Sequence, residues 1–219
     1  MKAYRCLVLD HDDTVVRSTP DIHYPSFIET LQLLRPNLPL PALEEYIRDN
    51  CLLGFAEMCD RLHFTPEEIE LEGRMWRRWI ENTVPKAYEG MEALICAFHQ
   101  AGGKICVSSH SDEDIIRRDY RARFGLEPDM IFGWELPRDK RKPHPYALDV
   151  IMEAFSLKAE EVLVVDDMRL GLDMAHARNV DFAWAAWSDT APVLKSEMET
   201  DADYTFASPG ELLDFISKG

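Results

Sequence analysis

Positive charge is scarce in this sequence, and that shortage argues against two classes of partner. Lys and Arg number 24 against 40 Asp and Glu, which gives a formal net charge of -16 and a pI near 4.8. Such a chain repels nucleic-acid phosphates and anionic lipid at long range. The basic stretch "RDKRK" at 138–142 is too short to offset that charge. We therefore expect no nucleic-acid partner and no membrane partner.

Cysteines are few and have no motif spacing. The chain has five, an odd number, without a CxxC pair, and most of them lie inside apolar runs: Cys6, Cys51, Cys59, Cys96 and Cys106. A disulfide framework or a zinc site would need paired cysteines at characteristic spacings. We therefore predict that these cysteines are reduced residues of the core.

Long hydrophobic runs are also missing. None reaches the length of a transmembrane helix, and Met1–Tyr4 lead directly into an expected strand rather than into a signal peptide. The expected location is the cytoplasm. With 219 residues, 46% of them hydrophobic, the chain can bury a core as one domain or as one domain with a smaller insert.

Short apolar runs and helical patterns alternate along most of the chain. Runs without polar alternation predict strands buried on both faces at 5–9, 104–108, 129–132, 161–165 and 181–186. Apolar spacings of three and four predict helices at 91–98, 111–122 and 148–155, and Ser208 is a candidate N-cap for one more. This alternation predicts an α/β fold with a Rossmann-like, doubly wound parallel sheet.

One segment breaks the alternation. Residues 17–86 contain helical patterns and no convincing strand, so we expect an all-helical insert after the first strand. The predicted domains are a core of residues 1–16 and 87–219 and an insert of residues 17–86. Within the insert we expect Trp76 and Trp79 to be core residues, and Arg74, Arg77 and Arg78 to form a solvated helix face.

Polar residues follow the strands at the edge where parallel sheets bind ligands. Asp10, Asp12 and Asp13 follow the first strand, Ser109 and His110 the second, Lys142 the third, and Asp166 with Asp167 the fourth. Carboxylates crowded in one site repel one another unless a cation lies among them. An all-oxygen donor set without a Cys/His cluster favours Mg²⁺, which shares its shell with water and substrate phosphate.

Four segments resemble the motifs of the haloacid dehalogenase superfamily, in that family's order. "LVLDHDDTVV" is similar to the DxDxT nucleophile motif, "ICVSS" to the strand-end Ser/Thr motif, "KPHP" to the lysine motif and "VLVVDD" to the terminal acidic motif. The match covers nearly the whole predicted core. The helical insert stands where subfamily I members have their C1-type cap.

The resemblance implies a role for each matching residue. Asp10 would be the nucleophile that forms an aspartyl-phosphate, and Asp12 the general acid and then the base. Ser109 would bind a phosphoryl oxygen, with His110 beside it as a substrate contact, and Lys142 would neutralise charge on the phosphoryl group and on Asp10. Mg²⁺ would be held by Asp166 and Asp167 together with Asp10 and the backbone carbonyl of Asp12.

Neighbouring residues compete for some of these roles. Ser108 or Ser111 could replace Ser109, and Lys140 or Arg141 could replace Lys142. Asp166 could serve outside the direct metal shell or cap the next helix.

The sequence departs from the family pattern at two positions. Asp13 stands where the family usually has a glycine, and Gly171 stands where many relatives have another Asp, as in a recognised "DD" variant of the acidic motif. Asp12 itself favours phosphate esters, because the family's dehalogenases and phosphonate-cleaving members generally lack an acid at that position.

The predicted function is a Mg²⁺-dependent phosphatase acting on a small phosphorylated metabolite, as a monomer or a homodimer. One alternative is a phosphomutase similar to β-phosphoglucomutase. His23 falls where some mutases have a histidine, but "FAEM" after Gly54 offers no Arg or Lys for a second phosphate. The other alternative is a non-catalytic protein that binds phosphometabolites.

Overall fold

The computed structural model describes residues 4–218. The strands are β1 (Cys6–Leu9), β2 (Val16–Arg17), β3 (Lys86–Ala87), β4 (Lys104–Ser108), β5 (Met130–Phe132), β6 (Val162–Asp166), β7 (Asp181–Ala185) and β8 (Tyr204–Phe206). The α-helices are α1 (Tyr24–Leu34), α2 (Leu43–Leu53), α3 (Phe55–Arg61), α4 (Pro66–Ile80), α5 (Met91–Gln100), α6 (Glu113–Phe124), α7 (Tyr146–Phe155), α8 (Arg169–His176), α9 (Ala191–Met198) and α10 (Pro209–Ile216). Short turns of other helix types are Thr19–His23, Arg138–Lys140 and Ala159–Glu161.

The main sheet has six strands in the order β5-β4-β1-β6-β7-β8, and all its pairs are parallel. Strand β1 lies in the middle of the sheet, with β4 and β5 added on one side and β6, β7 and β8 on the other. The predicted doubly wound α/β fold is therefore confirmed. All four β1 residues are buried, as expected for a central strand covered on both faces.

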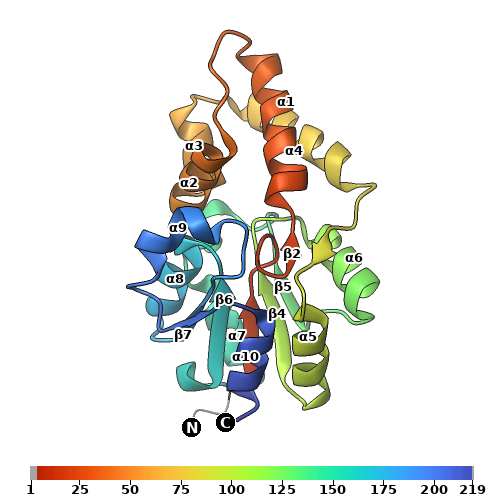
Figure 1. The fold of residues 1–219 in the computed structure, drawn as a ribbon, viewed down its shortest axis with the longest axis vertical. Helices are drawn as coiled ribbons and strands as arrows, with labels where there is room; N and C mark the ends of the chain where they lie inside the picture. Colours follow the sequence, from red (N-terminus) through yellow and green to blue (C-terminus); the bar gives the residue numbers. More distant parts are fainter. Residues whose placement is uncertain (1–3, 219) are drawn as a thin grey trace.

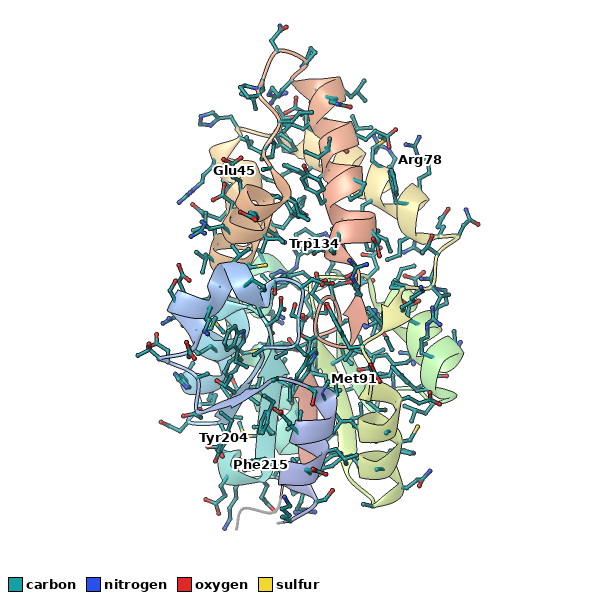
Figure 2. All side chains as sticks on the ribbon, viewed as in Figure 1. Glu45, Arg78, Met91, Trp134, Tyr204 and Phe215 are labelled. Atoms are coloured by element: carbon teal, nitrogen blue, oxygen red, sulfur yellow. The ribbon has the colours of Figure 1, made fainter. Side chains whose placement is uncertain are left out.

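Alternate residues of the strands pack into two hydrophobic cores, one on each face of the sheet. Cys6 and Val8 belong to a core covered by α7, α8 and α9, while Leu7 and Leu9 belong to a core covered by α5, α6 and α10. Figure 2 shows Met91 of α5 against the sheet, and Tyr204 and Phe215 packed together at the far end, their ring centroids 4.8 Å apart.

Helices α1 to α4 gather at one end of the molecule, beyond the carboxyl ends of the sheet strands (Figure 1). They share a small apolar core that includes Phe27, Leu31, Tyr46 and Met58. Among residues 4–218, none of the helices combines the length and apolar character that a membrane crossing requires.

The expectation of a strand-free segment at 17–86 was wrong at its two ends. Val16 and Arg17 pair antiparallel with Ala87 and Lys86, so the two chain segments that enter and leave the helical insert are joined by a two-stranded ribbon. Both predicted domain boundaries cut this ribbon. Two-residue strands are too short to show a side-chain periodicity, which explains why the sequence did not reveal them.

Candidate active site

The acidic loop after β1 lies between the ends of two other strands because β1 pairs with both β4 and β6. Asp10 is the first residue of that loop and is 3% exposed. Its backbone N–H donates to the carbonyl of Val165 at 2.9 Å, which continues the sheet for one residue past β1. The residues that follow β4 and β6 are Ser109 and Asp167, so the three strand ends converge as the sequence predicted.

Lys142 joins the acids of β1 and β6. Its Nζ donates to Asp10 Oδ1 at 2.9 Å and to Asp166 Oδ2 at 2.6 Å, and all three side chains are buried. Burial acts to lower the pKa of Lys142, but the two carboxylates outweigh it and raise that pKa above its usual value. Of the competing basic residues, Lys140 instead lies over the Tyr146 ring and Arg141 over the Trp134 ring.

Asp10, Asp166 and Asp167 form a buried group in which one oxygen from each lies within 4.8 Å of the others. Burial raises the pKa of Asp167 well above its usual value, and the carboxylates of Asp166 and Asp10 add to that effect. Three carboxylates and the Lys142 ammonium leave a formal charge of minus two when all are ionised. Donor type, spacing and charge therefore fit one hard divalent cation such as Mg²⁺.

Three hydroxyl groups hold Asp167 in place, and sequence reasoning missed those of Ser188 and Thr190. Thr190 Oγ1 donates to Asp167 Oδ2 at 2.5 Å, Ser188 Oγ to the same oxygen at 3.4 Å, and Thr14 Oγ1 to Oδ1 at 3.4 Å. Thr190 precedes α9 and lies far along the chain from the acidic motif, so only the fold brings it near.

Asp12 is not part of the group formed by Asp10, Asp166 and Asp167, and its carboxylate has other hydrogen-bond partners. His23 Nε2 is 3.0 Å from Asp12 Oδ1, Ser18 Oγ donates to the same oxygen at 2.7 Å, and Ser111 Oγ donates to Oδ2. Burial acts to raise the pKa of Asp12, but His23 and the hydrogen bonds lower it below its usual range. The carboxylate of Asp12 is therefore not among the clustered ligands, and only its backbone carbonyl remains available for the predicted metal contact.

The structure separates the three serines after β4. Ser109 lies in the wall of a cavity over the acids, and its Oγ accepts the Ser111 N–H at 3.3 Å. Ser108 Oγ points to Met174 Sδ, 3.8 Å away, and Ser111 binds Asp12. Ser109 is thus the one of the three placed to meet a ligand in the cavity.

His110 also lines the cavity. Burial lowers its pKa to about 3, and the nearby charge of Lys142 acts in the same direction. Its ring lies edge-on to Trp134 with centroids 5.9 Å apart. At neutral pH it is therefore an uncharged side chain that can donate or accept one hydrogen bond.

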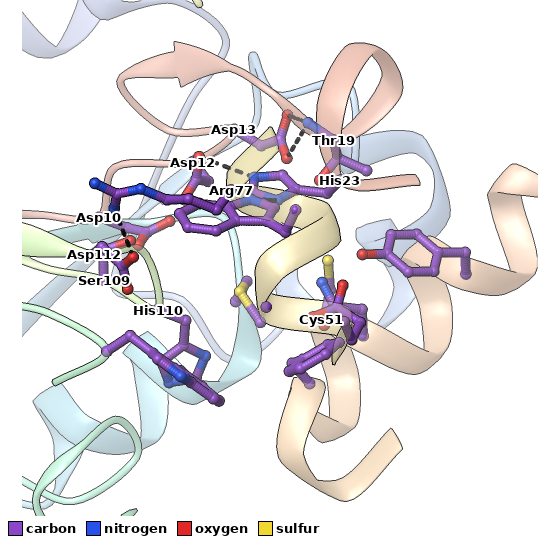
Figure 3. Close-up of a pocket in the computed structure, with 18 of the residues that line it drawn as sticks. Asp10, Asp12, Asp13, Thr19, His23, Cys51, Arg77, Ser109, His110 and Asp112 are labelled. Carbon is purple, nitrogen blue, oxygen red and sulfur yellow. Dashed lines mark hydrogen bonds and ion pairs between the residues drawn. The ribbon is translucent and has the colours of Figure 1, made fainter. Parts of the chain in front are cut away.

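Asp13 occupies a position where the backbone is left-handed, with φ of 59°. A glycine is the usual residue for this conformation, and Asp is one of the few others that tolerate it. Its carboxylate accepts the backbone N–H of Ser18 at 3.3 Å and that of Thr19 at 3.2 Å, the second of which is drawn in Figure 3, while burial raises its pKa to about 6. The extra acid is therefore used to hold the turn that enters the helical insert.

Gly171 explains the second departure from the family pattern. A Cβ at this position would lie 2.2 Å from Asp166 Oδ2, a distance at which atoms overlap. The side chain of Asp166 occupies the space that a residue at 171 would need. The same carboxylate accepts the Met168 N–H at 2.8 Å through its other oxygen, so it also closes the turn before α8.

The cavity extends from these acids into the helical insert and has a volume of about 510 Å³. Asp10, Asp12, Ser109, His110 and Asp167 line its sheet side, whereas Lys142 and Asp166 are not in its wall. In Figure 3, Asp10 and Ser109 lie on one side of the opening and Cys51 on the other.

Residues of α4 line the cavity too. Trp76 packs against a small buried cluster as expected, but it also forms part of the cavity wall. Of the predicted solvated arginine face, Arg74 and Arg78 are exposed, whereas Arg77 is half-buried in the wall. Trp79 is 36% exposed and donates to Glu29 at the surface. Helical spacing shows which residues share a face, but it does not show whether that face meets a core or a cavity.

Comparison with known proteins gives one family. The profile of the haloacid dehalogenase-like hydrolases matches residues 4–177. A phosphoglycolate phosphatase from Vibrio cholerae is 24% identical over 181 residues, which is 77% of this chain and 78% of the relative.

Solved structures give the same fold. A haloacid dehalogenase-like hydrolase from Bacteroides fragilis has a TM-score of 0.80 at 18% identity, covering 95% of this chain and 99% of that one. The Rhodobacter sphaeroides protein CbbY, in complex with xylulose-(1,5)-bisphosphate, has a TM-score of 0.75 at 18% identity and covers 95% and 96%. The chain therefore belongs to the haloacid dehalogenase-like hydrolases and is an enzyme of the phosphatase type.

Proposed function

We propose that this phosphatase hydrolyses a small phosphate monoester through an aspartyl-phosphate on Asp10, with Mg²⁺ as cofactor. The observation that carries the proposal is the placement of Asp10, Asp12 and Asp167 around one cavity. Lys142 lies outside the cavity wall and donates a hydrogen bond to Asp10. One end of a small-molecule pocket thus brings together a candidate nucleophile, a separate acid-base residue, a lysine and a group of acids suited to a metal ion.

In the first step an oxygen of Asp10 attacks phosphorus, the bond to the ester oxygen breaks, and that oxygen takes a proton from Asp12. In the second step Asp12 takes a proton from water, whose oxygen attacks phosphorus and releases phosphate from Asp10. The low pKa of Asp12 favours the ionised form that acts as the base, and the proton it takes from water in the second step is the one it gives to the ester oxygen in the next turnover.

The remaining roles concern charge and position. Lys142 would neutralise charge on Asp10 and the phosphoryl group, and Ser109 would bind a phosphoryl oxygen, with His110 as a substrate contact. Asp10, Asp166, Asp167 and the backbone carbonyl of Asp12 would hold Mg²⁺. When bound, this ion supplies charge neutralisation and orientation of the phosphoryl group.

Residues 17–86 would act as a cap on a core formed by residues 1–16 and 87–219. Support comes from the ribbon of β2 and β3, which is the joint between the two parts, and from cavity walls that belong to both. Closure of such a cap excludes bulk water from the phosphoryl group. The cytoplasmic location, and the choice between monomer and homodimer, stay predictions.

The first test is hydrolysis of para-nitrophenyl phosphate with and without Mg²⁺, with Asp10→Asn as the control variant. Release of nitrophenol that requires Mg²⁺ and disappears in the variant is expected. Activity that survives in Asp10→Asn would contradict the proposed nucleophile. A folded protein that releases no nitrophenol with Mg²⁺ present would favour a phosphomutase or a cap too selective for this probe.

A phosphomutase is the second candidate, because His23 falls where some mutases of the family have a histidine near the nucleophile, and it lies 3.0 Å from Asp12. In a mutase the phosphoryl group on Asp10 returns to a sugar instead of passing to water. An isomerisation assay with a phosphosugar separates the two functions.

A further inference from the structure

Glu72 is an acid on the buried side of α4. It shares that side with Ile69 and Trp76, three residues before it and four after it. It is 7% exposed and lines the cavity. Within residues 4–218 it has no hydrogen bond or ion pair, and burial raises its pKa to about 7. An unpaired carboxyl inside an apolar stripe is a costly arrangement unless a ligand completes it.

The walls around Glu72 are apolar and rich in aromatic rings. They include Tyr46, Phe55, Ile69, Trp76, Trp134 and Met168. Tyr46 lies near enough to Glu72 for that carboxyl to help raise the pKa of the phenol, after the larger effect of burial. Aromatic faces attract cations, so rings and a carboxylate together favour a positively charged group.

The cavity is poorly suited to a second anion. Arg77 donates to Asp112 and Asp114 at 2.8 Å each, so its charge is already balanced by carboxylates. Arg74 lies 3.8 Å from Glu70, and its side chain is 65% exposed. Beyond the phosphate end, an anionic substituent would therefore face the unpaired charge of Glu72 without a free cation in the described wall.

We propose that the substrate is a phosphate monoester whose alcohol part is an aromatic or apolar group carrying a protonated amine, and that the amine binds Glu72. This inference rests on the proposed phosphatase function. It sets the chain apart from the relatives reported above: phosphoglycolate carries a carboxylate and xylulose-(1,5)-bisphosphate a second phosphate. Either group would bring a negative charge towards Glu72.

The test compares O-phosphotyramine with 4-ethylphenyl phosphate, which has the same ring without the amine, and with phosphoglycolate. In the wild type, kcat/KM for the amine should exceed that for the ethyl compound by about tenfold, as one charge-assisted hydrogen bond predicts. Glu72→Gln should bring the ratio close to one by raising KM for O-phosphotyramine. Glu67→Gln, an exposed acid in the first turn of the same helix, is the matched control.

Two outcomes would overturn the inference while leaving the phosphatase function intact. The first is equal or better use of 4-ethylphenyl phosphate or phosphoglycolate by the wild type. The second is an unchanged ratio in folded Glu72→Gln. If the wild type hydrolyses none of the three esters, calorimetric binding to Asp10→Asn decides: tighter binding of the amine supports the inference, and equal or absent binding overturns it.

Discussion

Trp76 Nε1 donates a hydrogen bond to His23 Nδ1 at 3.0 Å, and the two rings are stacked at an angle of 6°. An indole N–H can only donate, so Nδ1 must be unprotonated and the proton must lie on Nε2. That nitrogen is the one 3.0 Å from Asp12 Oδ1. A residue of α4 therefore selects the tautomer of the histidine that contacts the proposed acid-base group.

Trp76→Phe tests this relationship, because it keeps an aromatic side chain that has no N–H. Without the hydrogen bond, His23 can adopt either tautomer, and we expect kcat to fall roughly fivefold, which corresponds to about 1 kcal/mol. Steady-state kinetics with para-nitrophenyl phosphate measures the change. Trp79→Phe loses an N–H that binds Glu29 at the surface and should leave kcat unchanged. Equal effects in the two variants would refute the proposed role.

Glu72 makes the free energy of unfolding depend on pH. Its pKa rises from 4.5 to about 7 on folding, so the native state binds the proton more tightly than the unfolded chain does. Stability associated with this group is complete below pH 4.5 and is lost as pH rises towards 7. Relative to Glu72→Gln, the wild type should lose up to about 3 kcal/mol over that range. Urea unfolding of both proteins at several pH values measures the difference. A constant difference would show that Glu72 does not titrate as the structure implies.

Metal removal should change stability as well as activity. The acids Asp10, Asp166 and Asp167 lie close together only in the folded chain, so a cation bound there stabilises the folded state. At a Mg²⁺ concentration one hundred times its Kd, we expect a gain of about 2.7 kcal/mol over protein in EDTA. Thermal unfolding with each additive measures it. Asp167→Asn should reduce the gain, whereas Asp203→Asn, at an acid half-exposed outside the site, should retain it.

Gly73 lies within α4, beside the cavity. A Cβ there would meet no atom within 4 Å, so Gly73→Ala adds a methyl group to the cavity wall without a clash. Alanine in a helix interior is more favourable than glycine, so stability should rise by up to about 1 kcal/mol. The smaller cavity should at the same time raise KM for bulky esters more than for small ones. Thermal unfolding and KM values for a size series of esters test both effects, and a uniform KM would place residue 73 away from the bound alcohol.

The sequence predicted the features that depend on local pattern. The apolar runs located five of the six strands of the main sheet, and the rule that ligands bind at strand ends brought Asp10, Ser109 and Asp167 together. It missed β8, which has three residues, and the eight-residue helices α8 and α9.

The sequence predicted less of the candidate site than of the fold. Thr190 and Trp76 contact the acids or their neighbours only through tertiary packing, so no spacing in the sequence joins them to the motifs. Glu72 did leave a signal: an acid in the same helical stripe as Ile69, Trp76 and Ile80 is unusual, since charged residues are seldom buried without a partner. The roles of Asp12, Ser109, His110 and Lys142, and the metal ligands, stay predictions.

The close approach of Gly171 to Asp166 also limits how this acidic motif can change over time. Since a side chain at 171 and the present carboxylate at 166 need the same space, an acid cannot be gained at 171 while the one at 166 is kept in place. A lineage that gains a side chain at 171 must therefore move or lose the side chain of Asp166 no later than in that same step.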